Sequence, residues 1–420
     1  DWESYQANKS RPACSHPQLR ELTRQSRPLT IEGGILNFQG YRRPNGSVGI
    51  RNHTLILPTV ICSSETALRI AAQVKRTVTF THQHGCEQIG RDMEQTFKTL
   101  AGVGCNPNVA AVLIIGLGCE TIGAEKILKV IERERKPTEM LNIQDEHGTR
   151  KTIDKGVAIA KRMTKTAIRM KREPCDVSEL VVGLECGGSD VTSGIASNPA
   201  LGVASDIIIR EGGTTILSET TELIGAEHII AKRAAAPRVE ERIYKIVKRM
   251  EERIKAMGVD FIGAQPSPGN IKGGLTTIEE KSLGCIYKAG TAKIREVLEY
   301  GEKPSEKGLV IMDTPGHDVE SITGMIAGGA QLIAFTTGQG TPVGSAITPV
   351  IKITGNPRTY RTMKENIDIN AGTVIEGKET IEQVGKRFFN EILRVASGKQ
   401  TKAESLGYHE FAINRIGPTL

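Results

Sequence analysis

The sequence predicts an α/β protein with two lobes, each built on a mostly parallel sheet, and an active site at the carboxyl ends of the strands. Short apolar runs alternate with helical segments along most of the chain, which is typical of βαβ units. Glycine is abundant, with 45 residues, while aromatic residues make up 4%. This composition suits turns that bring the backbone close to a ligand. Most of the unusual polar residues directly follow an apolar run, where ligands of parallel sheets bind.

Composition excludes several other classes of protein. The 420 residues allow two or three domains, and 38% hydrophobic and 25% charged residues are ordinary for a globular protein. No apolar run approaches the roughly 20 residues of a membrane helix, and residues 1–4 do not resemble a secretory leader. The net charge of +7 comes without a nucleic-acid motif, so we expect a small anionic substrate rather than nucleic acid or a membrane as partner.

Residues 1–38 show little periodicity and are expected to form an extended N-terminal tail. A first α/β domain is predicted over residues 39–177. Its expected strands are residues 54–60, 77–80, 109–115 and a short one near Met140, and its expected helices are residues 65–75, 90–101, 124–134 and 154–171.

A second α/β domain is predicted over residues 178–420. Apolar runs at 180–184, 214–217, 309–312 and 332–335 are interpreted as strands, and each leads into a polar or Gly-rich segment. An amphipathic helix is expected over residues 239–257.

The eight cysteines form no CxxC pair, so a zinc ribbon or a thioredoxin-type site is not expected. A chain with this much potential core needs no disulfide framework, and we expect a reducing, cytoplasmic compartment. Four cysteines end apolar runs: Cys62, Cys86, Cys119 and Cys186. We interpret the other four as small buried apolar residues: Cys14, Cys105, Cys175 and Cys285.

The polar residues at the strand ends could bind a divalent metal. Thiolate, imidazole and carboxylate groups together suit iron or zinc, and the candidate groups are the four thiols at strand ends with His82, Glu120, Asp190 and Glu219. Each has a second interpretation, the thiols as buried apolar residues, His82 as a hydrogen-bonded loop residue, and the acids Glu219, Glu222 and Asp190 as helix caps. Gly116-Leu117-Gly118 lacks the third glycine of a dinucleotide fingerprint, and no phosphate-binding GxxxxGK[ST] motif exists.

Taken together, several segments resemble the altronate/galactarate dehydratase family, which includes the large subunit of sulfolactate sulfo-lyase. They cover residues 39–415 in the expected order. The matching segments are residues 40–52, His82 with Cys86, residues 116–120, residues 186–190, Ser193-Gly194, Asn198-Pro199, Ser218-Glu219, residues 273–277, residues 280–282, residues 313–315, residues 336–338 and residues 368–370.

The resemblance implies a lyase that acts on a hydroxylated carboxylic acid with the help of Fe²⁺ or another divalent metal. The first expectation is dehydration of a sugar acid to a 2-keto-3-deoxy acid, and the second is release of sulfite and pyruvate from (2R)-sulfolactate. A non-catalytic sugar-acid binding protein and a nucleotide-dependent α/β enzyme are the alternatives of other classes. Gln339 stands where the family usually has arginine, which removes a potential bidentate partner for a carboxylate or sulfonate.

The resemblance also assigns residues to roles. The expected metal ligands are His82, Cys86, Cys119, Cys186 and Glu219. The expected catalytic residues are His82, Lys281, Glu280, Ser189 and Asp190. The expected substrate-binding residues are Arg51, Asn52, Asn270, Thr337 and Gly338. We expect Cys86, Cys119, Cys186 and His82 to converge in one cleft, because strand ends share one edge of a parallel sheet.

Single-chain dehydratases of the family carry a small substrate-binding domain of the SAF type ahead of the catalytic part. Residues 1–38 offer no pattern for such a domain. We therefore expect either a separate SAF-type small subunit as partner or a shortened chain, and otherwise a homo-oligomer.

Overall fold

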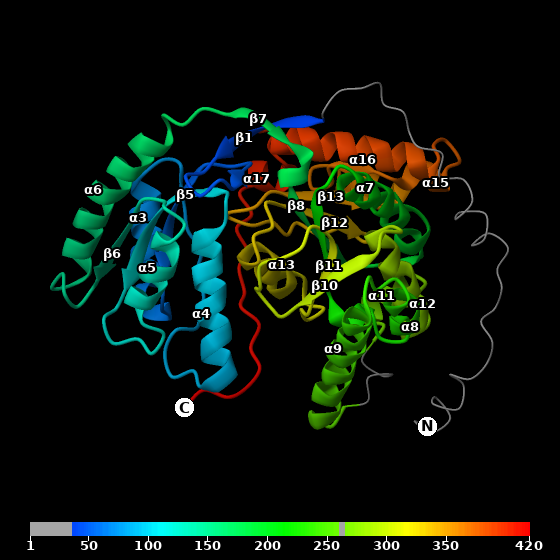
Figure 1. The fold of residues 1–420 in the computed structure, drawn as a ribbon, viewed down its shortest axis with the longest axis horizontal. Coiled ribbons are helices and arrows are strands. Elements are labelled where there is room, and N and C mark those ends of the chain that lie inside the picture. Colours follow the sequence, from blue (N-terminus) through cyan, green and yellow to red (C-terminus); the bar gives the residue numbers. More distant parts are fainter. Residues whose placement is uncertain (1–35, 260–264) are drawn as a thin grey trace. The chain divides into compact units, whose positions relative to one another are not determined.

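A computed structural model describes residues 36–259 and 265–420, and residues 37–420 form one compact unit (Figure 1). The unit contains two parallel sheets, of four and seven strands, and a three-stranded antiparallel sheet. The predicted α/β class with mostly parallel sheets is confirmed. Most of the predicted tail, residues 1–35, lies outside the described residues. Within the described part, none of the helices combines the length and the apolar character that a membrane span requires.

The four-stranded sheet has the strand order β4-β3-β5-β6, and all neighbours are parallel. Its strands are β3 (His53–Pro58), β4 (Thr77–Val78), β5 (Val109–Gly116) and β6 (Thr138–Asn142). Every residue of β5 is buried, as expected for a central strand covered on both faces. The helices that follow the strands are α3 (Ile61–Gln73), α4 (Gly90–Cys105), α5 (Ala124–Glu132) and α6 (Thr149–Ala167).

The seven-stranded sheet has the order β10-β11-β9-β8-β12-β13-β14, again with parallel neighbours. Its central strands are β8 (Val181–Gly187), β9 (Thr214–Leu217), β11 (Gly308–Met312) and β12 (Leu332–Thr337). Its outer strands are β10 (Ile294–Leu298), β13 (Val350–Thr354) and β14 (Ile369–Asn370). The chain enters the sheet at its centre, in β8, and leaves it at the edge strand β14.

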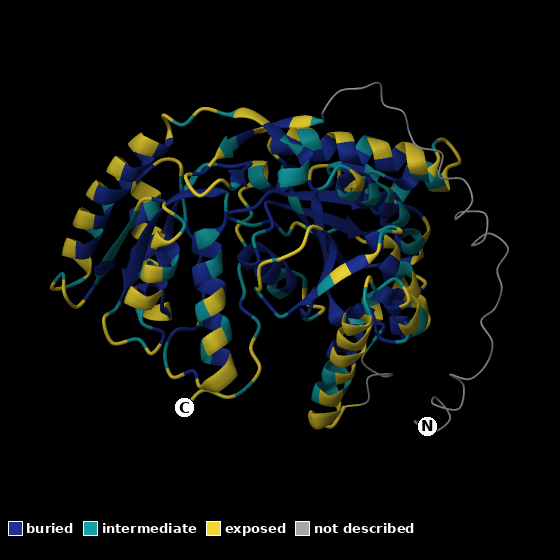
Figure 2. Cartoon of the chain, in the orientation of Figure 1, coloured by how far each residue is buried: buried dark blue, intermediate teal, exposed yellow. Residues whose placement is uncertain are grey.

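Helices surround this second sheet and turn their apolar sides toward it, while their outer sides are exposed (Figure 2). The longer ones are α7 (Asn198–Arg210), α9 (Pro237–Ala256), α12 (Ile278–Cys285), α13 (Asp318–Ala327) and α16 (Ile381–Ala396). The shorter ones are α8 (Glu227–Ala231), α11 (Pro268–Lys272), α14 (Pro357–Thr362), α15 (Gly372–Ile375) and α17 (Lys402–Leu406).

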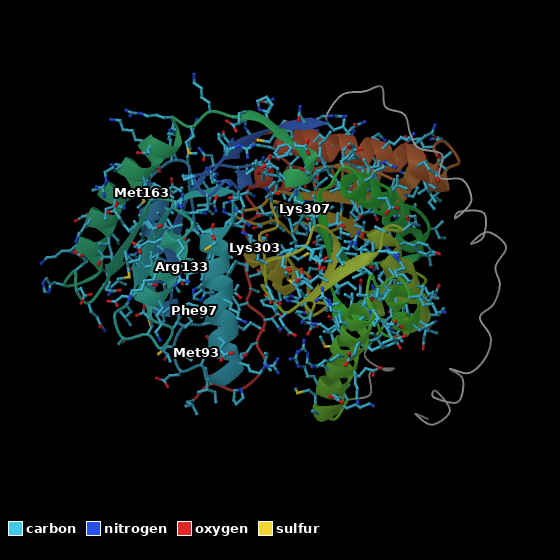
Figure 3. All side chains as sticks on the ribbon, viewed as in Figure 1. Met93, Phe97, Arg133, Met163, Lys303 and Lys307 are labelled. Atoms are coloured by element: carbon cyan, nitrogen blue, oxygen red, sulfur yellow. The ribbon has the colours of Figure 1, made fainter. Side chains whose placement is uncertain are left out.

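One hydrophobic core continues from the first parallel sheet to the second. It includes Leu57 of β3, Leu100 of α4, Met325 of α13 and Phe335 of β12, and Met93 and Phe97 of α4 pack against it (Figure 3). Gly102 lets α4 approach α13 closely, because a Cβ atom there would lie 2.4 Å from the Ala327 carbonyl oxygen. The two sheets therefore share helix α4 and its apolar contacts.

The sequence located most strands well and placed helix ends less accurately. The strand 214–217 has the predicted bounds, whereas α3 begins at Ile61 rather than at residue 65 and α6 runs from Thr149 to Ala167 rather than over 154–171. The antiparallel sheet β2-β1-β7 was not predicted. It consists of β1 (Asn37–Arg42), β2 (Val48–Gly49) and β7 (Glu173–Asp176), and its register pairs Phe38 with Cys175. Such long-range pairing leaves no local pattern in the sequence.

Arg51, which we expect to bind substrate, joins segments that are far apart in the sequence. All five guanidinium N–H groups donate to protein acceptors: both carboxylate oxygens of Glu404, at 2.6 and 2.8 Å, and the carbonyl oxygens of Ile50, Val395 and Lys399, each at 2.9 Å. Asn52 likewise donates to the Ala167 carbonyl oxygen and accepts from Arg43. In this structure both side chains hold the segment after β2 in place.

We expect Arg51→Met to lower the free energy of unfolding by about 3 kcal/mol, because it leaves the Glu404 carboxylate largely buried without its partner. Urea denaturation measures this change. Arg69→Met is the matched control, since Arg69 forms an exposed i,i+4 pair with Glu65 and its loss should be barely measurable. Unchanged stability with a large rise in KM for Arg51→Met would instead support the substrate-binding role.

Candidate functional site

The carboxyl ends of β8, β9 and β11 bring together a cluster of buried ionisable groups. Glu185 and Cys186 lie near the end of β8, Glu219 follows β9 by two residues, and Asp318 begins α13. Helix α12 and the 3₁₀ turn Ile286–Ala289 supply the remaining basic and thiol groups. We call the following residues the strand-end cluster: Glu185, Cys186, Glu219, Glu222, Lys281, Cys285, Lys288 and Asp318.

The ammonium group of Lys288 lies at the centre of the strand-end cluster. Its Nζ atom donates to Glu219 Oε2 at 2.6 Å and to Glu222 Oε2 at 3.2 Å, and its side chain is 1% exposed. Burial alone would lower the pKa of Lys288, but the carboxylates of Glu219 and Glu222 raise it well above its usual value. Lys288 is therefore charged, and it balances part of the negative charge around it.

Glu222 contacts the thiol of Cys186 and a second lysine, Lys281. The Cys186 thiol donates to Glu222 Oε2 at 2.8 Å, and the sulfur atoms of Cys186 and Cys285 are 3.6 Å apart. Lys281 Nζ lies 3.3 Å from Glu222 Oε1. Although burial acts to raise the pKa of Glu222, Lys288 and Lys281 lower it to about 2. Glu222 is thus ionised and well supplied with positive charge.

The other carboxyl groups of the cluster have less compensation, because the positive charge of Lys288, which pairs with Glu219, is the one they share. Burial, together with the charge of Glu219, raises the pKa of Glu185 well above its usual value. Burial and the charge of Glu222 raise the pKa of Glu219 to about 7 and that of Asp318 to about 6. Four carboxyl groups face two ammonium groups in the cluster, so it carries an excess of negative charge when all are ionised.

The backbone of Glu219 is itself unusual. Its φ is 66° and its ψ is 68°, a left-handed conformation that costs a non-glycine residue about 1–3 kcal/mol. The surroundings enforce it, because Glu219 N donates to Thr314 Oγ1 at 2.7 Å and the Glu219 carboxylate accepts from Cys186 N at 2.9 Å. Its side chain makes no capping bond, so the alternative interpretation of Glu219 as a helix cap is not what the structure shows.

Among the described residues, two triplets have potential metal-ligand atoms within 4.8 Å of one another: Cys186, Glu222 and Cys285, and Glu185, Glu219 and Asp318. The carboxylate triplet fits a divalent cation better. The pKa values of all three acids are raised, and Glu185 Oε1 is a buried oxygen with no hydrogen-bond partner in the described part of the chain. In the thiol triplet, Glu222 is already neutralised by two lysines.

Five predicted site residues lie together beside the strand-end cluster. Ser189 Oγ donates to Cys186 Sγ at 3.6 Å, and Asn270 Nδ2 donates to the Ser189 carbonyl oxygen at 2.9 Å. A Cβ atom at Gly338 would lie 2.3 Å from Asp190 Cγ, so these two segments touch. Thr337, at the end of β12, precedes Gly338.

Asp190 has a structural role in this region. Its carboxylate accepts from Thr192 Oγ1 at 2.6 Å, from Ser193 N at 3.1 Å and from Asn356 Nδ2 at 2.9 Å. Its Oδ1 atom thus accepts from the first backbone N–H of the π-helical turn Ser193–Ser197, a bond of the kind that the capping interpretation describes.

His82, Cys86 and Cys119 lie in the loops at the carboxyl ends of the first sheet. The loops are neighbours, since Ile122 N donates to the Gly85 carbonyl oxygen. His82 Nε2 bonds the Pro58 carbonyl oxygen at 2.9 Å and its Nδ1 accepts from His84 N, while burial lowers the pKa of His82 to about 4. A metal or proton-transfer role for His82 would require one of these contacts to break.

The structure brings Cys186 and Glu219 of the expected metal ligands into contact. No hydrogen bond or ligand triplet within residues 36–259 and 265–420 links them to His82, Cys86 or Cys119. Convergence of all these groups in one cleft stays a prediction. Of the neighbours Glu280 and Lys281, Lys281 belongs to the cluster, while the exposed Glu280 accepts from Thr276 N and Oγ1 at the start of α12.

Sequence reasoning missed Glu185, Lys288 and Asp318, and it classed Cys285 among the plain buried cysteines. Two signals were present. Glu185 is an acid inside the apolar run of β8, and burying an unpaired charge is expensive enough to imply a purpose. Lys281, Cys285 and Lys288 are spaced by four and three residues, so they lie on one helical face.

Comparisons with known proteins match this chain to one family. The family model described as D-galactarate/altronate dehydratase, C-terminal, matches residues 177–419, and that of D-galactarate dehydratase/altronate hydrolase, second domain, matches residues 40–168. The (2R)-sulfolactate sulfo-lyase subunit beta of Chromohalobacter salexigens is 42% identical over 381 residues, 90% of this chain and 97% of that protein. Altronate dehydratase of Escherichia coli is 38% identical over 405 residues, 93% of this chain and 80% of that protein. Altronate dehydratase of Bacillus subtilis is 36% identical over 397 residues, 91% of this chain and 78% of that protein.

The pKa of Glu219 predicts a pH dependence of stability in metal-free protein. Between about 4.5 and about 7 the folded protein holds this proton more tightly than the unfolded chain, so the contribution of Glu219 to stability falls as pH rises through this window. Glu222 contributes above its unfolded pKa, and its contribution is lost as pH falls from 4.5 toward 2. We expect the stability of wild type relative to Glu219→Gln to decrease by on the order of 3 kcal/mol from pH 4.5 to pH 7.

Urea denaturation in the presence of a chelator, at a series of pH values, measures this difference. Glu240→Gln, on the exposed side of α9, should show no such trend. A difference between wild type and Glu219→Gln that does not change with pH would contradict the raised pKa.

Proposed function

Because the chain belongs to the D-galactarate/altronate dehydratase family and is a lyase, we propose that it removes water from a sugar acid with the help of a divalent metal. The product is a 2-keto-3-deoxy acid. The reaction requires loss of the proton α to the carboxylate and of the hydroxyl group on the neighbouring carbon, followed by tautomerisation of the enol.

The observation that carries this proposal is the carboxylate triplet at the strand ends, whose three acids share the single ammonium group of Lys288. Glu185, Glu219 and Asp318 have converging ligand atoms and raised pKa values, and oxygen ligands of this kind suit Fe²⁺, Mn²⁺ or Mg²⁺. We propose that these three acids hold the metal, so that Glu219 alone of the predicted ligands His82, Cys86, Cys119, Cys186 and Glu219 binds it. A divalent ion there supplies Lewis-acid polarisation of a substrate oxygen, which acidifies the α-carbon.

Lys281 is the residue of the cluster best suited to assist departure of the hydroxyl group. Its side chain is 11% exposed, against 1% for Lys288, and Glu222 raises its pKa although burial opposes this. The Nζ atom therefore carries a proton at neutral pH and lies nearer the edge of the cluster. We propose that it donates this proton to the leaving hydroxyl oxygen.

A second candidate is the release of sulfite from a sulfonated hydroxy acid. It is favoured by the 42% identity and 97% coverage of the sulfo-lyase subunit beta. Sulfite is a better leaving group than hydroxide and needs little protonation, so the role of Lys281 distinguishes the two reactions.

The word "subunit" in the name of that relative supports a separate partner for this chain. We propose that an SAF-type small subunit completes the enzyme. We also propose a cytoplasmic location, because the described part of the chain contains seven free cysteines, which a reducing compartment preserves.

Turnover of a substrate panel tests the proposed function. We expect wild type, supplied anaerobically with Fe²⁺ and assayed with and without an SAF-type subunit, to form a 2-keto acid from galactarate or altronate. Exhaustive chelation should abolish this activity. Release of sulfite from (2R)-sulfolactate without dehydration would select the second candidate, and full turnover after chelation would refute metal assistance.

We expect Lys281→Gln to lower kcat for dehydration by about 10²–10⁴-fold, the usual contribution of a general acid, and to lower kcat for sulfite release much less. Steady-state kinetics on both reactions measure this difference. The matched control is Glu280→Gln on the same helix, whose carboxylate is engaged by Thr276 and whose loss should leave kcat within about threefold. A larger effect of Glu280→Gln than of Lys281→Gln would reverse this assignment.

A further inference from the structure

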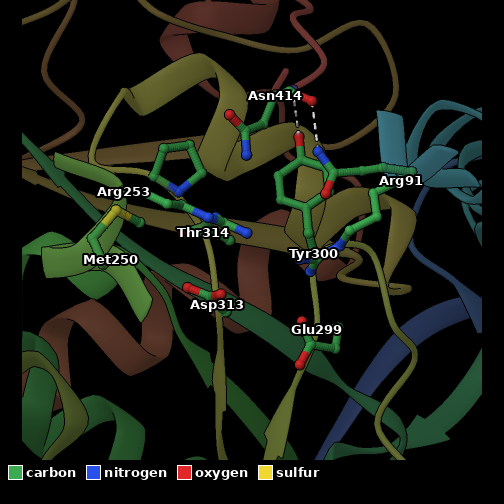
Figure 4. A pocket seen from close by; sticks show the side chains of 10 residues that line it. Arg91, Met250, Arg253, Glu299, Tyr300, Asp313, Thr314 and Asn414 are labelled. Carbon is green, nitrogen blue, oxygen red and sulfur yellow. Dashed lines mark hydrogen bonds between the residues drawn. The ribbon is translucent and has the colours of Figure 1, made fainter. Parts of the chain in front are cut away.

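A small polar pocket lies beside the strand-end cluster, at the carboxyl end of β11. Its lining includes Arg91 of α4, Arg253 of α9, and Glu299, Asp313, Thr314 and Asn414. Arg91 and Arg253 approach it from opposite sides (Figure 4). The cavity measures about 20 Å³, which accommodates one small polar group rather than a whole sugar acid.

The pocket contains more positive charge than its own carboxylates can balance. Arg249 donates to both Glu299 and Asp313, and Arg242 donates to Glu299. Arg91 and Arg253 have no hydrogen bond and no ion pair within the described part of the chain. The guanidinium groups of Arg242 and Arg249 pair with the carboxylates of Glu299 and Asp313. The two guanidinium groups that line the cavity, those of Arg91 and Arg253, have no carboxylate partner in the described part of the chain.

The charges in this pocket act on one another. Burial lowers the pKa of Arg253, and the neighbouring Arg249 and Arg91 lower it further against the opposing effect of Asp313. Like charges held this close favour an anion between them.

Hydrogen bonds connect the pocket directly to the strand-end cluster. Thr314 lines the pocket, and its Oγ1 atom accepts from Glu219 N at 2.7 Å and lies 3.0 Å from Ser321 Oγ. Ser321 Oγ in turn donates to Glu185 Oε2 at 2.7 Å. Asp313 accepts from Thr220 Oγ1 at 2.5 Å. The same short segment after β11 therefore borders both the carboxylate triplet and the unpaired arginines.

We propose that Arg91 and Arg253 form a subsite for a second acidic group of the substrate, so that the substrate is a dianionic hydroxy acid. This inference rests on the proposed function, because it places the reacting end of the molecule at the strand-end cluster. The second group is a carboxylate or a sulfonate, since guanidinium binds both through paired hydrogen bonds. A monoanionic sugar acid would leave the two arginines without a partner.

Calorimetric binding to metal-free protein tests the subsite independently of turnover. The probes are galactarate, with two carboxylates, altronate, with one, and sulfolactate, with a carboxylate and a sulfonate. We expect wild type to bind at least one dianion about 10- to 100-fold more tightly than altronate, as expected for a charge-assisted contact. Arg253→Gln and Arg91→Gln should abolish this preference. The dianion that is bound more tightly distinguishes a carboxylate from a sulfonate.

Lys245→Gln is the matched control, because Lys245 is exposed on α9 and outside the pocket, and it should keep the preference. Thermal unfolding verifies that each variant is folded, and the exposed position of Arg91 makes its variant the safer of the two. Equal affinities of wild type for dianions and altronate, or a preference that survives in both arginine variants, would overturn the subsite. If the arginine variants lose the preference of wild type for dianions, but wild type turns over none of the probes, the subsite is supported and the proposed function is refuted.

Discussion

The buried ammonium group of Lys288 is the interaction on which the candidate site depends. It lies between Glu219 and Glu222 with 1% of its side chain exposed. Removing one member of a buried charged group leaves the others uncompensated, which is far more costly than losing an exposed pair. Lys288 thus connects the turn after α12 to the loop after β9. Its positive charge also acts to lower the pKa values of the four acids of the strand-end cluster.

The distribution of positive charge divides the cluster into two parts with different chemistry. Glu222 has two lysines and is ionised, whereas Glu185, Glu219 and Asp318 share the charge of Lys288 alone and have raised pKa values. This arrangement suits the proposed function, because a cation would be attracted to the carboxylate triplet while the ammonium groups would attract an anionic substrate. The strained backbone of Glu219 is consistent with a position selected for chemistry rather than for stability.

Packing between the two sheets extends the site beyond one lobe. Helix α4 contributes to the shared core and contacts α13, whose first residue is Asp318. The same helix carries Arg91 to the pocket that adjoins the strand-end cluster. Under the proposed subsite, the first lobe would take part in substrate recognition through Arg91, while its loop residues His82, Cys86 and Cys119 form no hydrogen bond with the strand-end cluster in the described part of the chain. Arg51, by contrast, uses its charge to hold the chain in place.

The sequence alone determined the α/β class, the order of most strands and the carboxyl edge as the place to look for chemistry, because burial periodicity and strand ends are local properties of the chain. It also singled out Cys186 and Glu219, which follow apolar runs, and Lys281, which lies in a segment that resembles the family. Only the tertiary structure decided which charges meet. Cys285 is an unremarkable helix residue until it lies 3.6 Å from Cys186, and Arg91 and Arg253 are ordinary surface charges until two distant helices bring them to one pocket. Whether a buried group binds a metal, caps a helix or neutralises a neighbour depends on the charges within a few ångströms of it, and that neighbourhood is created by folding.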